Sequence, residues 1–304
     1  MKQLFLGALI CFCTTASYSQ GIKITSTETL NLPKSESAYS PVISPAGDYI
    51  LITGNDLKGL SKYDLASKQL STITTDKGAG FDVQISEDGS LIAFRSQIYK
   101  NRLKYTTLKA IDLKTGKQQD IIKDSRDIEK YIIKDGTVLA VEKGVVKSKR
   151  ITGKQLTKTP NISSIRQGQL YLNKNKQADN ISPAGKQYNY LWTSISPDGA
   201  KMLYYVIELG KAFVSNIDGT NAVSLGTLRT PKWAGNNWVV GMEDYDDGVT
   251  ITSSKIVIIS STGKNRTDLT DKSVIATNPS SSIDGKKIVY NTNDGRIHLI
   301  TIEF

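Results

Sequence analysis

The chain has 304 residues, of which 38% are hydrophobic and 22% charged, and its formal net charge at pH 7 is +10. This composition is that of a folded, soluble domain with a sizeable core, and it excludes an intrinsically disordered chain. The lysines stand throughout the sequence and do not line one face, so the basic excess does not indicate a nucleic-acid-binding protein.

The first residues have the features of an export signal. Lys2 supplies the positive start, and residues 4–12 (LFLGALICF) form an apolar core that is too short to span a bilayer. Ser17 and Ser19 are small residues of the kind that precede a cleavage site. We therefore predict a signal peptide over residues 1–19, and no transmembrane segment in the mature chain.

Both cysteines, Cys11 and Cys13, lie inside this segment, so the domain predicted over residues 20–304 has no disulfide and no thiol nucleophile. An exported protein without cysteines favours a bacterial envelope, periplasmic or extracellular, over a eukaryotic secretory route. Two alternatives stay open at the terminus: a buried helix, and a lipoprotein signal. The large residues Ile10 and Phe12 directly before the cysteines disfavour the lipoprotein signal.

The mature sequence opens with a strand-like segment, IKITSTETLNL (22–32), and then repeats two kinds of hairpin. The first kind is a short alternating strand, a turn ending in glycine, and a strand rich in Ile, Leu, Val and Tyr. Glycine after Asp or Asn suits tight hairpin turns, which need positive φ. The copies of this first hairpin cover 40–53, 82–94, 129–141, 163–173, 194–206, 231–242 and 278–290.

The second kind of hairpin alternates with the first and reads strand, polar turn, strand. One first and one second hairpin make a unit of four strands, A to D. The second hairpins cover 63–73, 111–122, 150–158, 180–191, 216–225 and 259–269.

The spacing of the units predicts their arrangement. The seven turn glycines of the first hairpins, from Gly47 to Gly285, stand about 40 residues apart, which is typical of propeller blades. We predict an all-β fold, a single β-propeller of four-stranded antiparallel blades. The motif count gives seven blades, and six is the alternative because the unit at 162–190 is short. The last unit ends in its third strand (296–304), so 22–32 is predicted to complete it and close the ring.

Three turns carry a resemblance to a known repeat. Residues 40–53, 82–94 and 194–206 resemble the PD40 (WD40-like) repeat of TolB-like β-propellers, whose signature is a strand ending in Ser-Pro-Asp-Gly. The copy at 196–199 is exact, and the other two are near matches. The resemblance implies the propeller fold over most of the mature chain, and a role as a periplasmic partner of envelope proteins. Many TolB-like propellers have six blades, and the count of seven departs from that pattern.

Strand alternation predicts which connections share a face. The A–B and C–D turns are short and stereotyped, whereas the B–C and D–A connections on the other face are long and irregular. Variable loops on a rigid scaffold usually carry binding residues, and the inner strands line a channel that opens to that face. These connections include 54–60, 97–104, 226–230 and 243–250.

Aromatic and cationic residues in these connections are the candidate binding residues, because such side chains anchor interfaces and can contact anionic or sugar-like ligands. A solvated loop that binds nothing is the alternative. The candidate set is Tyr99, Lys100, Arg102, Arg229 and Tyr245.

The acidic segment EDYDDG (243–248) is a candidate for calcium, which takes six to eight oxygen ligands. The candidate ligands are Asp244, Asp246 and Asp247, but Gly248 stands where the third acidic residue of a calcium loop belongs. A solvated acidic loop is again the alternative. We expect no other cofactor.

The residues of catalytic sites are mostly missing. There is no G-x-S-x-G motif, and the single histidine, His298, lies in a predicted strand. We therefore predict a non-enzymatic exported binding or scaffold protein, monomeric, whose partner is an envelope protein or an anionic or glycan ligand rather than nucleic acid. The alternative is a propeller-fold carbohydrate-active enzyme, a glycosidase or a lyase, which would use carboxylates at the channel mouth.

Overall fold

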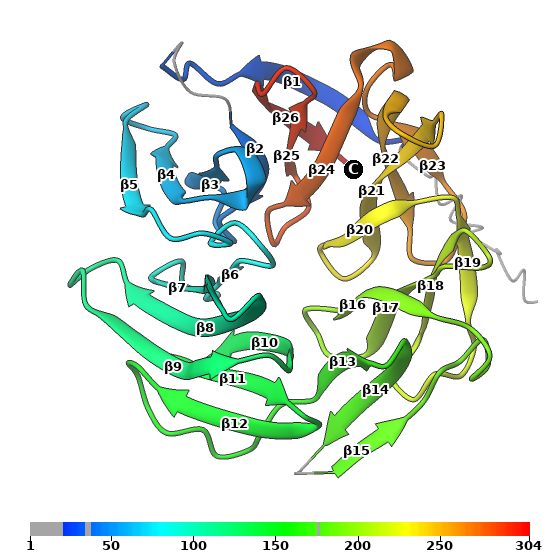
Figure 1. The fold of residues 1–304 in the computed structure, drawn as a ribbon. Helices are drawn as coiled ribbons and strands as arrows, with labels where there is room; N and C mark the ends of the chain where they lie inside the picture. The colour runs from blue at the N-terminus through cyan, green and yellow to red at the C-terminus, as the bar shows by residue number, and fades with distance from the viewer. Residues whose placement is uncertain (1–20, 34–37, 175–176) are drawn as a thin grey trace, which may run out of the picture.

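The computed structural model describes residues 21–33, 38–174 and 177–304. Seven antiparallel sheets follow one another along the chain and form a ring of blades (Figure 1). The fold is therefore the predicted all-β propeller, with seven blades rather than six. The predicted signal peptide, 1–19, lies outside the described residues. None of the described helices is long and apolar enough to cross a membrane.

Four blades have four strands that are consecutive in the chain, with strand A innermost. Blade 1 contains β2 (Tyr39–Ile43), β3 (Tyr49–Thr53), β4 (Leu60–Asp64) and β5 (Leu70–Thr74), and the short 3-10 helix η1 (Asn55–Leu57) precedes β4. Blade 2 contains β6 (Gln84–Ile85), β7 (Leu91–Lys100), β8 (Leu103–Asp112) and β9 (Gln118–Ser125). Blade 5 contains β16 (Tyr190–Ile195), β17 (Lys201–Val206), β18 (Lys211–Asn216) and β19 (Val223–Gly226). Blade 6 contains β20 (Arg229–Ala234), β21 (Trp238–Asp246), β22 (Ile251–Ser260) and β23 (Arg266–Asp268), and the 3-10 helix η2 (Lys272–Val274) follows it.

Blades 3 and 4 have three strands each, which corrects the second hairpins predicted at 150–158 and 180–191. Neither segment forms a fourth strand. Pro183 cannot donate a ladder hydrogen bond, and Pro160 stands just beyond the other segment. Blade 3 contains β10 (Ile128–Lys134), β11 (Thr137–Glu142) and β12 (Val145–Arg150), and blade 4 contains β13 (Ile162–Arg166), β14 (Gln169–Lys174) and β15 (Gln177–Asn180).

The two ends of the described chain meet in blade 7, as predicted. Its strands are β24 (Ala276–Ser281), β25 (Lys287–Thr292), β26 (Ile297–Glu303) and, outermost, β1 (Lys23–Thr29). β1 pairs antiparallel with β26 over its whole length, from Lys23 opposite Glu303 to Thr29 opposite His298. The N-terminal strand therefore closes the ring.

The core consists of apolar layers between neighbouring blades. Strands B such as β3, β17 and β25 are covered on both faces, so they are buried at consecutive positions rather than at alternate ones. Between blades 1 and 7, Ile50 and Tyr63 pack with Val289 and Leu299, and Leu30, just after β1, joins this cluster. Burial of these layers fixes the positions of the blades around the ring.

The Ser-Pro-Asp-Gly turns have a structural role. The Ser196 hydroxyl donates to the Asp198 carboxylate over 2.6 Å and accepts from the backbone N–H of Lys201 over 2.9 Å. Hydrogen bonding from Ser196 lowers the pKa of Asp198 below its ordinary value. Gly199 has φ of +76°, which favours glycine. The motif that carries the resemblance thus fastens an A–B hairpin.

Candidate functional site

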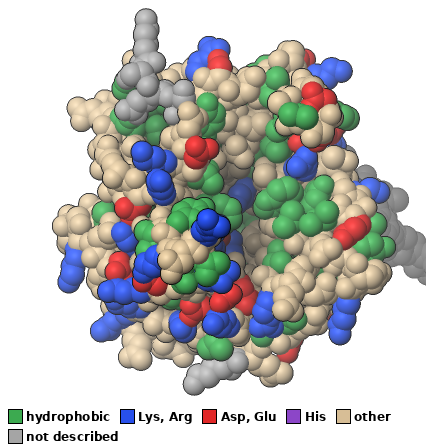
Figure 2. Space-filling view, in the orientation of Figure 1, with side chains coloured by type: hydrophobic (Ala, Val, Ile, Leu, Met, Phe, Trp, Pro, Cys, Tyr) green, Lys and Arg blue, Asp and Glu red, His purple; other side chains and the backbone are tan. Residues whose placement is uncertain are grey.

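The B–C and D–A connections lie on one face of the ring, which we call the loop face. Of the thirteen exposed large hydrophobic side chains among the described residues, eleven belong to this face; Ile24 and Ile283 are the exceptions. Figure 2 shows hydrophobic side chains on both sides of a central hollow. Exposed apolar side chains gathered on one face are typical of a surface that binds another molecule. The eleven are Phe81, Ile98, Tyr99, Leu103, Val145, Leu191, Ile207, Leu209, Tyr245, Val249 and Val274.

Segment 97–104, expected to be an irregular loop, is the end of a long hairpin. β7 and β8 stay in register up to the pair formed by Lys100 and Leu103. Asn101 and Arg102 both have positive φ, as a two-residue turn of type I′ requires. The hairpin presents Tyr99, which is 66% exposed, while the Lys100 ammonium pairs with the Asp124 carboxylate at 2.8 Å.

A second long hairpin, formed by β21 and β22, carries the acidic segment. The Asp244 side chain is fully buried and lies 2.9 Å from the Arg229 guanidinium, which is 3.6 Å from the Asp246 carboxylate. Burial raises the pKa of Asp244, and the charge of Arg229 opposes this rise. Arg229 is therefore first an ion-pair partner, although its side chain is 40% exposed.

Asp247 has a different position from the other two calcium candidates. Its carboxylate accepts hydrogen bonds from the backbone N–H groups of Val249 and Thr250, at 2.9 and 2.8 Å, and so closes the turn of the hairpin. These hydrogen bonds lower the pKa of Asp247. Within residues 21–33, 38–174 and 177–304, no group of three or more His, Cys, Asp or Glu residues could hold a metal ion. The geometry thus offers no cluster in support of the calcium prediction.

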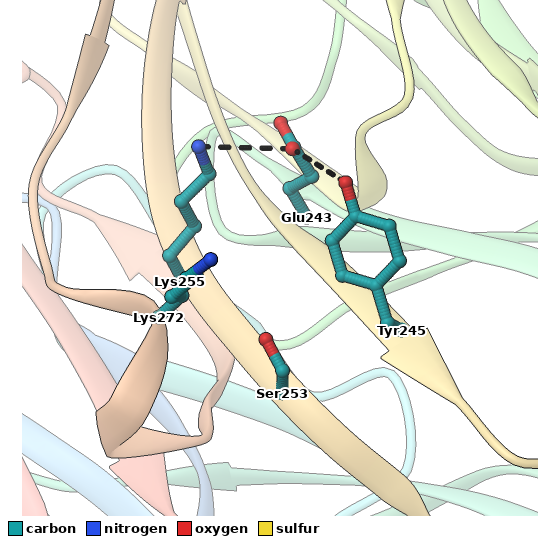
Figure 3. A pocket seen from close by; sticks show the side chains of 5 residues that line it. All are labelled: Glu243, Tyr245, Ser253, Lys255 and Lys272. Carbon is teal, nitrogen blue, oxygen red and sulfur yellow. Dashed lines mark hydrogen bonds and ion pairs between the residues drawn. The ribbon is translucent and has the colours of Figure 1, made fainter.

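A pocket of about 420 Å³ lies between the β21–β22 hairpin and η2 (Figure 3). The Tyr245 hydroxyl donates to the Glu243 carboxylate over 3.3 Å, and Lys255 lies 3.6 Å from the same carboxylate. Of the lining residues, the sequence prediction included Tyr245 alone; Glu243 begins the acidic segment 243–248 but was not a candidate ligand, and the other three belong to no motif. The pocket is lined by Glu243, Tyr245, Ser253, Lys255 and Lys272.

Charged side chains also meet between the inner strands of blades 2 and 3. Lys130, on β10, lies 3.0 Å from the Asp82 carboxylate, and both side chains are largely buried. The Arg95 guanidinium stacks over the rings of Phe81 and Tyr131. Sequence reasoning missed these residues because they come from separate blades and no local pattern links them.

The inner strands carry a repeated distortion at the channel. In five blades, one residue at or just before the start of strand A has φ between +46° and +52°, and in four of these strands the pairing register shifts there. Left-handed backbone at a residue with a side chain costs about 1–3 kcal/mol and is common at functional sites. Such bulges interrupt the alternation of side chains between the two faces of the strand and so change the direction in which a side chain points. The five residues are Ser40, Asp82, Trp192, Thr230 and Asn278.

The predicted binding residues fall into two groups that do not converge. Tyr99, Lys100 and Arg102 belong to blade 2, whereas Arg229 and Tyr245 belong to blade 6. Blades 7 and 1 stand between them on the shorter way around the ring (Figure 1). A single partner that contacts both groups must span the channel mouth.

Comparisons with known proteins show the fold. No protein-family model and no curated protein matches the sequence. The solved structures that resemble it include RRP9 WD40 repeats (TM-score 0.63, 11% identity, 93% of this chain and 100% of that one). TolB from Acinetobacter baumannii has a TM-score of 0.55 and 18% identity, over 82% of this chain and 58% of that one. An oligogalacturonate lyase in complex with manganese has a TM-score of 0.51 and 14% identity, over 88% and 78%. The chain therefore has the β-propeller fold that TolB and WD40 proteins share.

Proposed function

We propose that this protein is an exported, non-enzymatic binding scaffold that captures a protein or glycan partner in a bacterial cell envelope through its loop face. The observation that carries the proposal is the placement of eleven of the thirteen exposed large hydrophobic side chains on that face. Exposed tyrosines at the ends of rigid hairpins contribute large contact areas and lose little conformational entropy on binding. The fold shared with TolB supports an envelope role by analogy of fold.

The ion pairs of the carboxylates on the inner strands and loop face support binding rather than catalysis. Glycoside hydrolysis needs two carboxyl groups that flank one bond, one of them protonated to act as the general acid, and a basic partner favours the ionised form. Here Asp82 pairs with Lys130, Asp244 with Arg229, and Glu129 lies 3.9 Å from Arg166. The second candidate function is nevertheless a carbohydrate-active enzyme, favoured by the fold shared with an oligogalacturonate lyase.

Alanine at Tyr99 and Arg102 together, and alanine at Tyr245 separately, should each reduce partner capture at least about tenfold, because hot-spot side chains carry most of an interface's energy. Capture is measured by quantitative mass spectrometry of proteins and glycans retained from envelope extract on the immobilised protein. A Lys117→Ala variant in the C–D turn of blade 2 is the control and should capture the partner as the parent does.

Two results would contradict the scaffold proposal. One is equal capture by the parent and the loop-face variants. The other is reproducible release of sugar or unsaturated product from a panel of envelope and dietary glycans, lost when Asp82 or Asp244 is changed to asparagine.

A further inference from the structure

One face of the β21–β22 hairpin forms a wall of an open groove on the loop face. Glu243 and Tyr245 alternate along β21. Their ladder partners on β22 are Lys255 and Ser253, so the four side chains lie on one face of the hairpin. η2 supplies Lys272 to the opposite wall (Figure 3). Because the small Ser253 stands opposite the exposed Tyr245, space remains beside the aromatic ring.

The groove continues beyond Lys255 into a second hollow. The two hollows have volumes of about 420 and 430 Å³ and share Lys255 and Lys272 in their linings. Segment 268–271, at the end of β23 and before η2, lines the second hollow. A groove of this form suits consecutive units of a chain better than one small, compact molecule.

Tyr245 is exposed and yet held in place. It is 60% exposed, and its hydroxyl donates to the Glu243 carboxylate over 3.3 Å. Lys255, at 3.6 Å, and Arg266 pair with that carboxylate, and Lys255 also pairs with Asp268 at 2.8 Å. The hydrogen bond to Asp268 raises the pKa of Lys255, so this network stays charged. An exposed ring that is fixed through its hydroxyl loses little freedom when a ligand packs on it.

The charges around the groove balance one another, so the groove does not select a strongly charged ligand. The Ser253 hydroxyl and the Lys272 ammonium line it, and neither has a hydrogen-bond partner among the described residues. The groove thus offers hydrogen-bond donors and acceptors beside an exposed aromatic ring. The charged groups are the carboxylates of Glu243, Asp268 and Asp271 and the basic groups of Lys255, Arg266 and Lys272.

A sugar chain fits this combination of groups. The hydroxyls of a pyranose both donate and accept hydrogen bonds. One face of the ring consists of C–H groups, which pack on the negative face of an aromatic ring. An extended peptide, by contrast, needs apolar pockets for its alternate side chains. Among the described lining residues the one large apolar side chain besides Tyr245 is Leu269, which is only 5% exposed.

We propose that this groove binds consecutive residues of an uncharged glycan chain. One sugar ring packs on Tyr245, and its hydroxyls bond to the Ser253 hydroxyl across the hairpin. The next sugar lies in the second hollow, where its hydroxyls accept hydrogen bonds from Lys272. The inference rests on the proposed function, since it selects a glycan among the partners of the loop face and gives the place where it binds.

Calorimetric titration of the purified chain with cellotetraose and, separately, with the tetramer of N-acetylglucosamine tests the site. At least one probe should bind saturably, with about one site per chain. A Tyr245→Ala variant should bind that probe at least about tenfold more weakly, because the stacking surface is lost. Tyr99→Ala is the matched control. Tyr99 is 66% exposed on the other long hairpin, in blade 2, and its loss should leave tetrasaccharide binding unchanged.

A second measurement uses the parent protein alone. Dilute acetic anhydride should acetylate Lys272, and the bound tetrasaccharide should slow that reaction while Lys117, in the C–D turn of blade 2, is labelled at an unchanged rate. No saturable binding of either probe, equal binding by Tyr245→Ala, or no protection of Lys272 would overturn the site. Retention of proteins alone from envelope extract, lost in Tyr245→Ala, would assign the groove to a peptide instead.

Failure of the groove and failure of the loop-face function give different results. The variant with alanine at Tyr99 and Arg102 leaves the groove intact, because both changes are in blade 2. Unchanged partner capture by that variant, together with tetrasaccharide binding in the groove, contradicts the loop-face function alone. Partner capture that needs Tyr99 and Arg102, without tetrasaccharide binding, contradicts the groove alone.

Discussion

Removal of residues 22–32 is expected to abolish cooperative folding of the ring. β1 is the outermost strand of blade 7 and pairs with β26 along its whole length, so its loss leaves β26 as an unpaired edge. It also removes Leu30, which is only 6% exposed and packs between blades 7 and 1. The chain beginning at residue 33 is compared with the chain beginning at residue 21 by thermal unfolding followed by circular dichroism.

Point variants separate strand pairing from packing in this prediction. Leu30→Ala should lower the free energy of unfolding by about 2–4 kcal/mol, because it leaves a cavity in a packed cluster. Ile24→Ala is the matched control, since Ile24 lies in the same N-terminal segment, on β1, and is 41% exposed, and it should change stability by less than about 1 kcal/mol. An unchanged unfolding midpoint in the shortened chain would mean that β1 does not hold the ring closed.

Arg229→Met is expected to lower the free energy of unfolding by about 2–3 kcal/mol, because it leaves the buried Asp244 carboxylate without its partner. The value lies below the cost of breaking a fully buried pair, since the Arg229 side chain is 40% exposed and water screens its charge. Lys68→Met is the control. The Lys68–Glu28 pair is exposed, with 3.4 Å between charges, and its loss should cost less than about 1 kcal/mol.

The pH dependence of the Arg229→Met effect has a definite sign. The folded-state pKa of Asp244 is above its ordinary value of 3.8, so the native state retains this proton to higher pH than the unfolded chain does. The contribution of Asp244 to the free energy of unfolding therefore falls as the pH rises through the folded-state pKa of Asp244. Removal of the Arg229 charge raises the pKa of Asp244 further, because that charge opposes the effect of burial. Urea unfolding should show the largest difference between variant and parent at pH 7 and a smaller one near pH 4; a pH-independent difference would refute the assignment.

The repeating hairpins were predictable because their determinants are local. The turn serine bonds an aspartate two residues on and the backbone five residues on, as Ser196 does with Asp198 and Lys201. Glycine at positive φ and apolar strand B complete the signal, so each hairpin appears within about a dozen residues. Counting strands then predicted seven blades and closure by 22–32. The predicted number of strands was too high in blades 3 and 4, where 150–158 and 180–191 do not supply a fourth strand.

The arrangement of side chains around the channel was decided by the tertiary structure. The sequence singled out Tyr99 and Tyr245 through the composition of their loops, and the structure exposes both. The sequence could not show that Arg229 pairs with Asp244. Nor could it show that Lys130 pairs with Asp82, which lies 48 residues away in the chain. Charges from neighbouring blades, such as those of Lys130 and Asp82, meet because the blades pack against one another in the ring, a property that no single repeat contains.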